Sequence, residues 1–156
     1  MTDSPSPATA SAAPDGQALE DTVGFNAVLG MKLVEWSAEH AVMELPIRDM
    51  HLNRSNALHG GVLATLIDAV CGYAGVWVPP GEPRRKALTL SLSTNFIGQA
   101  REGTVQATAV KKGGGRNIFF ASCEVRDAAG NLLAMGEGSF RYRKSDPYGE
   151  PPKAEA

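Results

Sequence analysis

Residues 59–79 read HGGVLATLIDAVCGYAGVWVP, a nearly uninterrupted apolar stretch in a chain of 156 residues. Asp68 is the one charged side chain between Gly60 and Val78. The large apolar residues recur every three or four positions, which is the period of one face of an α-helix rather than of a strand. They are Val62, Leu63, Leu66, Ile67, Val70 and Cys71. The stretch therefore predicts one long amphipathic helix that is buried in the core.

Asp68 falls on a different face of this predicted helix. An ionised carboxylate in apolar surroundings is costly unless a partner pairs with it or a reaction uses it. The residues that share its face are small, and they are Gly61, Ala64, Thr65, Gly72 and Gly75. Small side chains let a second backbone or a ligand approach the carboxylate. We therefore take Asp68 as a candidate catalytic residue, the alternative being a structural carboxylate capped by a neighbouring loop.

The same stretch approaches the ~20 apolar residues of a membrane-spanning helix. However, a charged side chain at the centre of a bilayer is costly, and the stretch lacks the basic and aromatic flanks that frame a span. We therefore expect a buried helix and no contact with a membrane.

The two ends of the chain have the composition of disordered segments. Residues 2–17 contain no large apolar residue, and residues 144–156 are rich in proline and charge. We expect disordered segments over 1–17 and 144–156 and a single domain over 18–143. The N-terminus lacks the basic region and apolar stretch of a secretory signal, which predicts a cytoplasmic protein.

Cysteine, histidine and charge argue against several classes of function. Cys71 and Cys123 have neither metal-site spacing nor a disulfide framework, and both lie in apolar patterns, so we expect two buried thiols. The three histidines form no paired motif, so we expect no metal and no other cofactor, and we expect His40 and His51 in surface turns. A net charge of −2 without a strongly basic face argues against nucleic acid as a partner.

The rest of the chain alternates between short apolar patterns and turn residues. A short helix is predicted within 18–30. Strands are predicted at 31–36, 41–47, 87–97, 103–112, 117–126 and 132–143. Strict alternation over the third of these places Leu88 and Leu90 on one face and Thr89 on the other. This order of elements predicts an α+β fold in which an antiparallel sheet wraps around one central helix.

Four elements occur together at fixed spacing, namely Asn53, His59-Gly60-Gly61, Asp68 and Thr89. The amide lies six residues before the histidine, and the acid lies nine after it. In these elements, and in layout over about residues 25–143, the chain resembles the hotdog-fold acyl-CoA thioesterases of the phenylacetate-degradation (PaaI-like) type. It departs from that family at Ala69 and Gly72, where relatives often carry Ser or Thr.

The resemblance implies hydrolysis of a small or aromatic acyl-CoA to free acid and CoA. By this resemblance, the Gly60 amide donates a hydrogen bond to the carbonyl oxygen of the thioester. The first residues of any helix have unpaired N–H groups, which suits this role. Asp68 would be the general base for water or a nucleophile that forms a mixed anhydride. Asn53 would hold the water or the carboxylate, or else only form an Asx-turn. His59 would orient the donor loop or contact the thioester, or else only begin the helix, and Thr89 would supply a supporting hydroxyl.

The spacing between Gly60 and Asp68 along the helix leads to a further expectation. Gly60 and Asp68 are eight residues apart, which is ~12 Å along a helix axis. One carbonyl group cannot contact both. If both act on one thioester, they come from two antiparallel copies of the helix, which predicts a homodimer with two sites at its interface. An exposed sheet face further predicts that dimers pair into tetramers.

Two groups of basic residues are candidates for binding the phosphates of CoA. The first lies around the glycine turn at 113–115 and comprises Lys111, Lys112 and Arg116. The second comprises Arg84, Arg85 and Lys86. For both groups the alternative is an ordinary solvated loop. At the helix start, Gly61 would let the thioester approach the backbone closely.

Two other functions stay open. A hydratase or dehydratase of the same fold needs a histidine opposite a carboxylate, and the one candidate, His59, belongs to the helix start. A non-catalytic acyl-CoA-binding module would keep the groove without the reaction.

Overall fold

The computed structural model describes residues 19–143, so the predicted disordered segments 1–17 and 144–156 lie outside the described residues. The helices are α1 (Gly24–Leu29) and α2 (Gly60–Val76), with a single 3-10 turn, η1 (Asp49–His51), between them. The strands are β1 (Lys32–Ser37), β2 (His40–Pro46), β3 (Ala87–Phe96), β4 (Thr104–Gly114), β5 (Ile118–Arg126) and β6 (Leu132–Tyr142). Every helix and strand that the sequence predicts is present.

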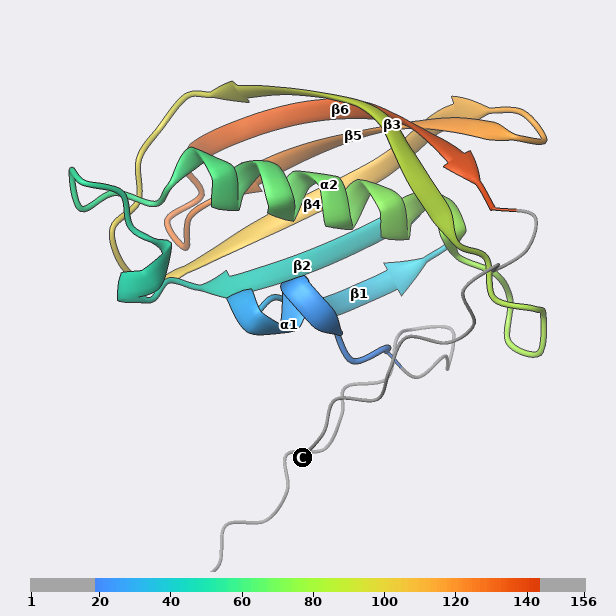
Figure 1. Ribbon diagram of the computed structural model, residues 1–156, viewed down its shortest axis with the longest axis horizontal. Helices are drawn as coiled ribbons and strands as arrows, with labels where there is room; N and C mark the ends of the chain where they lie inside the picture. Colours follow the sequence, from blue (N-terminus) through green and yellow to red (C-terminus); the bar gives the residue numbers. More distant parts are fainter. Residues whose placement is uncertain (1–18, 144–156) are drawn as a thin grey trace, which may run out of the picture.

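The strands form one antiparallel sheet in the order β1-β2-β4-β5-β6-β3. Figure 1 shows this sheet curving around α2, with β1 and β3 as its two edges. The α+β hotdog architecture predicted from the sequence is therefore confirmed. Among residues 19–143, no helix is long and apolar enough to cross a membrane.

The large apolar face of α2 packs against the concave side of the sheet. Its fully buried side chains are Leu66, Ile67, Val70 and Cys71. Cys123 of β5 is buried as well, so the prediction of two core thiols is confirmed. Burial of this face stabilises the helix more than the helix propensity of its residues does, because four of the residues of α2 are glycines.

Gly75 occupies a different position from the one expected. The sequence placed it on the open face with Asp68, but Gly75 is buried, and a Cβ there would lie 1.9 Å from the ring of Phe119. The expectation is wrong because β5 and β6 cover the last turn of α2, where the Tyr142 hydroxyl also donates to the Gly75 carbonyl oxygen at 3.0 Å. Glycine at this position lets the helix approach the sheet closely.

A bulge in β3 changes the face that Thr89 occupies. Thr89 pairs with Phe140 and Ser91 pairs with Ser139, so Leu90 is an extra residue that has no paired residue in β6. An extra residue interrupts the alternation of side chains. Thr89 consequently lies on the helix side of the sheet, beside the buried Phe140. The strict alternation predicted for this strand is therefore wrong.

His51 is buried, which corrects its prediction as a surface turn residue. Its side chain is 0 % exposed, and Nδ1 accepts a hydrogen bond from the Arg48 N–H at 3.0 Å. The loop after η1 folds back on this residue, because the N–H of His59 donates to the carbonyl oxygen of His51 at 2.8 Å. His40 also differs from its prediction, since it is the half-buried first residue of β2.

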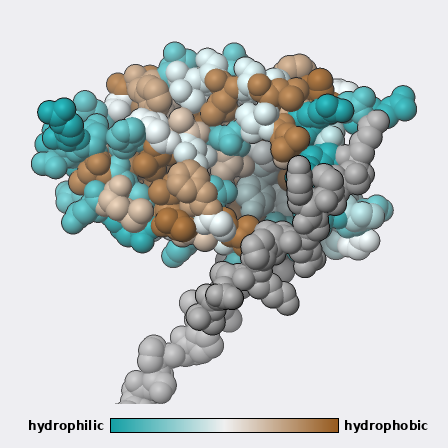
Figure 2. Space-filling view, in the orientation of Figure 1, coloured by the Kyte–Doolittle hydropathy of each residue, from teal (hydrophilic) through white to brown (hydrophobic). Residues whose placement is uncertain are grey.

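Two groups of exposed large apolar side chains lie around α1 and along β3 (Figure 2). Around α1 they are Val23, Phe25 and Val28, and on β3 they are Leu88, Leu90 and Phe96, each more than half exposed. Long apolar edge strands are normally protected by pairing or by cover. β3 is such an edge within the single chain.

Candidate active site

Asp68 meets Thr89 beside the middle of α2. The Thr89 hydroxyl donates a hydrogen bond of 2.7 Å to Oδ1 of Asp68. The bulge in β3 makes this contact possible, because it moves the threonine to the helix side of the sheet. A hydroxyl bound to one carboxylate oxygen orients the carboxylate and leaves the other oxygen for a reacting molecule. The structure thus brings together the acid and the hydroxyl that the sequence singled out.

A cavity of about 350 Å³ opens at this pair. Along α2 its wall is formed by Asp68, Ala69, Gly72, Tyr73 and Val76. No atom lies within 4 Å of the place that a Cβ on Gly72 would occupy. The two small residues that depart from the family pattern, Ala69 and Gly72, therefore leave open space next to the acid.

The cavity is also lined by Glu20, Asn26 and Tyr73, none of which was selected as a site residue from the sequence. The Tyr73 ring packs edge-on against Trp36, with ring centroids 5.4 Å apart. Burial raises the pKa of the Tyr73 phenol, and the charge of Glu20 adds to that shift. Tyr73 is thus held in place as a neutral hydroxyl donor. Tyr73 could not be predicted as a site residue, because a tyrosine in an apolar helix has the same sequence pattern as a core residue.

The start of α2 presents one amide without a partner. Nδ1 of His59 accepts a hydrogen bond from the Gly61 N–H at 2.9 Å, and the His59 carbonyl oxygen accepts from Val62 and Leu63. Within residues 19–143, the Gly60 N–H has no acceptor. An Nδ1 atom that accepts a hydrogen bond carries no proton, so Nε2 is the ring nitrogen of His59 that can donate. His59 caps the helix and leaves the Gly60 amide available to a ligand.

Asn53 closes the loop that leads into α2. Its side-chain oxygen accepts hydrogen bonds from the Ser55 N–H at 2.8 Å and from the Ala57 N–H at 3.2 Å. This is the Asx-turn that the sequence analysis named as one of two possibilities for the residue. The turn holds the backbone before His59 in place. The amide oxygen of Asn53 is occupied by these bonds, so any contact with a ligand would use its NH₂ group.

The two halves of the predicted chemistry lie apart in one chain. Asp68 and Thr89 border the cavity, whereas the helix start with His59 and Gly60 is absent from its lining. Eight residues of α2 separate Gly60 from Asp68, which is ~12 Å along the axis. A single chain does not bring the amide and the acid to one carbonyl group.

Of the two groups of basic residues named from the sequence, the second contributes to the cavity and the first does not. The first group lies away from it: Lys111 forms an ion pair of 3.4 Å with Glu39, and neither Lys112 nor Arg116 lines the cavity. The basic residues that do line it are Arg85, Lys86 and Arg143.

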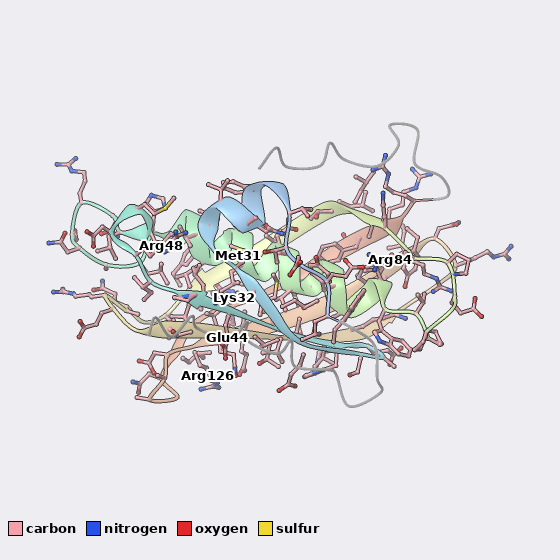
Figure 3. All side chains as sticks on the ribbon, turned by 90° about the horizontal axis from the view of Figure 1, so that it is seen from below. Met31, Lys32, Glu44, Arg48, Arg84 and Arg126 are labelled. Carbon is pink, nitrogen blue, oxygen red and sulfur yellow. The ribbon has the colours of Figure 1, made fainter. Side chains whose placement is uncertain are left out.

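Arg143 could not be associated with this group from the sequence, because only the pairing of β3 with β6 brings it there. Arg84, at the same end of the molecule, forms a 2.6 Å ion pair with Glu20. Figure 3 shows Arg84 and Arg48 toward opposite ends of α2, with Met31 and Lys32 between them.

Comparison with known proteins agrees with the fold and with the motif. Residues 55–134 match the thioesterase superfamily. Acyl-coenzyme A thioesterase 13 of Mus musculus is 28% identical over 118 residues, which cover 72% of this chain and 81% of that protein.

Two solved structures are similar in both fold and sequence. One is a mutant of the phenylacetic acid degradation protein PaaI from Thermus thermophilus, with a TM-score of 0.66, 26% identity and coverage of 75% of this chain and 96% of that one. The other is zebra fish thioesterase superfamily member 2, with a TM-score of 0.67, 27% identity and coverage of 78% and 88%. With half of its length matched to the superfamily, the chain belongs to the thioesterase superfamily and is a PaaI-like, hotdog-fold thioester hydrolase.

Proposed function

We propose that this protein hydrolyses a small or aromatic acyl-CoA to the free acid and CoA. The observation that carries the proposal is the Asp68 carboxylate, which Thr89 orients at a cavity and which follows the unpartnered Gly60 amide by eight residues on one helix. Thioester hydrolysis needs these two functions, a donor for the carbonyl oxygen and a group that activates or replaces water. The acyl-CoA substrate is supported by the name of the mouse relative.

The reaction can follow either of two courses at this site. With Asp68 as general base, its carboxylate takes a proton from water while the water oxygen attacks the carbonyl carbon. The carbonyl oxygen becomes an oxyanion that accepts a hydrogen bond from the Gly60 N–H. The C–S bond then breaks, and the departing thiolate takes the proton. With Asp68 as nucleophile, a carboxylate oxygen attacks and expels the thiolate, and water then hydrolyses the mixed anhydride.

Both courses need a second copy of the chain. The Gly60 amide and Asp68 lie ~12 Å apart along α2, which is too far for both to contact one carbonyl group. They can meet at one carbonyl group only if one of them comes from a partner subunit whose helix runs antiparallel. Two features support a homodimer. The helix face beside Gly72 is open, and β3 is an exposed edge that carries Leu88 and Leu90. Further pairing of dimers into tetramers remains a prediction.

The remaining roles are assigned as follows. His59 holds the donor loop through its bond to the Gly61 amide, and Gly61 lets the thioester approach. Asn53 keeps the loop in place and offers its NH₂ group to the water. The candidates for binding the phosphates of CoA remain two groups: Lys111, Lys112 and Arg116 lie outside the cavity, whereas Arg85 and Lys86 line it.

The test is release of thiol from a panel of short and aromatic acyl-CoA esters. Asp68→Asn should lower kcat by ~100-fold or more and change KM little, because a base or nucleophile acts in the chemical step. Glu137→Gln is the control, since this exposed carboxylate on β6 does not line the cavity.

Two outcomes would favour the other candidate functions. Tight binding of the esters by the wild type without turnover would indicate an acyl-CoA-binding module. Hydration of an enoyl-CoA faster than cleavage of any thioester would indicate a hydratase. Unchanged kcat in Asp68→Asn would contradict the role of this acid.

A further inference from the structure

The cavity at Asp68 has a basic end that the hydrolytic reaction does not use. Arg85 and Lys86 directly precede β3, and Arg143 directly follows β6. The last pair between these strands joins Ala87 to Tyr142, and beyond it the Arg143 N–H donates to the Lys86 carbonyl oxygen at 2.9 Å. Strand pairing thus fixes three basic residues at one end of the same cavity.

The two carboxylates that line the cavity each have a partner of their own. They belong to Glu20 and Asp68. Glu20 is paired with Arg84, at 2.6 Å, and Arg84 itself does not line the cavity. Asp68 is held by the Thr89 hydroxyl. Three basic and two acidic residues therefore line the cavity, and one of the two acids is paired with an arginine outside it.

The Arg85 side chain is positioned as well as charged. Its guanidinium carbon lies 5.6 Å from the centre of the Tyr142 ring, a distance at which a cation is attracted to an aromatic face. Stacking of this kind restrains the plane of a guanidinium and leaves the N–H groups at its rim able to donate. Planar, bidentate donation suits the oxygens of a carboxylate or a phosphate.

The separation between the acid and the basic end suits a ligand that reaches both. Lys86 and Arg85 precede Thr89 by three and four residues, which is ~10 to 14 Å along extended chain. Long basic side chains shorten that distance by several ångströms. A thioester with its carbonyl at Asp68 can therefore place a second, charged group at Arg85 and Lys86.

We propose that Arg85, Lys86 and Arg143 form an anion subsite that binds an anionic oxygen group of the thioester substrate. This inference rests on the proposed hydrolase function and adds to it a requirement on the substrate. The anion has two sources of the same chemistry, a carboxylate on the acyl group or a phosphate of CoA. Both are oxygens that a guanidinium and an ammonium group bind in the same way.

Four substrates separate the two sources. Butyryl and succinyl groups have the same number of carbons and differ in a terminal carboxylate, and each can be attached to CoA or to N-acetylcysteamine, which has no phosphate. The variants are Arg85→Gln and Arg85→Gln with Lys86→Gln. The control is Arg101→Gln, which removes the same charge from an exposed arginine outside the cavity. Arg85→Lys keeps a charge and should restore part of any loss.

The expected result is a loss of at least ~10-fold in kcat/KM, as is typical for removal of a charge-assisted hydrogen bond. If the acyl carboxylate is bound, the loss appears with both succinyl esters and with neither butyryl ester. If a phosphate is bound, the loss appears with both CoA esters and with neither N-acetylcysteamine ester. The subsite is overturned if the variants leave all four values unchanged, reduce all four equally, or behave like Arg101→Gln.

Calorimetric binding of the same four esters to Asp68→Asn protein, with and without Arg85→Gln, separates this inference from the proposed function. If the wild type releases no thiol, but Arg85→Gln weakens binding of the esters in one of the two patterns above, the hydrolase function is contradicted and the anion subsite is supported. If the wild type releases thiol and Arg85→Gln does not change binding of the esters, the hydrolase function is supported and the anion subsite is contradicted. Thermal unfolding of each variant identifies a loss that is due to misfolding, in which case Arg85→Lys provides the comparison.

Discussion

Replacing Gly60 with proline would delete the unpartnered amide at the start of α2 and leave the local backbone almost unchanged. Proline has no N–H and is favoured at the first position of a helix, which Gly60 occupies. His59 has φ −66 and ψ 134, within the region that a residue before proline prefers. A Cβ at position 60 would lie 3.4 Å from the exposed ring of Phe96. The variant should therefore fold.

The expected loss follows from what the amide does. If the Gly60 N–H donates to the carbonyl oxygen as that oxygen becomes negatively charged, its removal should lower kcat by about 100- to 1,000-fold, which corresponds to about 3 to 4 kcal/mol. KM should change little, because the bond strengthens in the transition state. Gly60→Ala provides the control, since it adds the same Cβ beside Phe96 and retains the N–H.

The assay is steady-state thiol release from one acyl-CoA, with circular dichroism and thermal unfolding to establish that each variant is folded. A folded Gly60→Pro protein with kcat within about threefold of wild type would refute the assignment of the donor. An equal loss in Gly60→Ala would show that crowding near Phe96, rather than the missing N–H, is responsible.

Three further predictions concern the assembly, the acid and a buried histidine. When inactive Asp68→Asn and Gly60→Pro proteins are mixed and allowed to exchange subunits, about a quarter of wild-type activity should return, because half of the dimers then contain one intact site of two; no recovery would show that sites are not shared between subunits. Thr89→Val should lower kcat by ~10-fold through loss of the hydrogen bond to Asp68, whereas Thr89→Ser should keep most activity, and equal losses would implicate the methyl group instead. Burial and the charge of Arg48 lower the pKa of His51 in the folded protein, so the unfolded state binds more protons and the free energy of unfolding should decrease as the pH falls below ~6.5. Urea unfolding at about pH 7.5 and pH 5.5 should show this decrease in the wild type and a smaller one in His51→Gln.

Local patterns in the sequence were sufficient to predict the elements of the fold. The helical period over 60–78 predicted α2, and five of the six large apolar residues that define the period are buried, whereas Val62 is half-buried. The strands predicted at 117–126 and 132–143 leave a short connection between them, and there the Asp127 carboxylate accepts from the Asn131 N–H at 2.9 Å. These signals act between residues close in sequence, where backbone preference alone decides the conformation.

The incorrect predictions depend on contacts between distant segments. Whether Gly75 lies on an open or a covered face depends on β5 and β6 reaching the end of α2. His51 is buried because the chain after η1 folds back over it. The bulge at Leu90 is a property of the pairing of β3 with β6, which are not neighbours in sequence. No periodicity within a single segment contains this information.

The candidate site combines both kinds of information, and this explains why only part of it could be predicted. A lone carboxylate in an apolar helix is conspicuous in the sequence, and the helical rise converts its eight-residue distance from Gly60 into the prediction of a second subunit. The hydroxyl that orients the carboxylate and the cations at the far end of the cavity come from β3 and β6. An anion subsite assembled from residues 85, 86 and 143 depends on the same strand pairing that delivers Thr89 to Asp68. A mutation that shifts this register should therefore impair the chemical step and the selection of the substrate together.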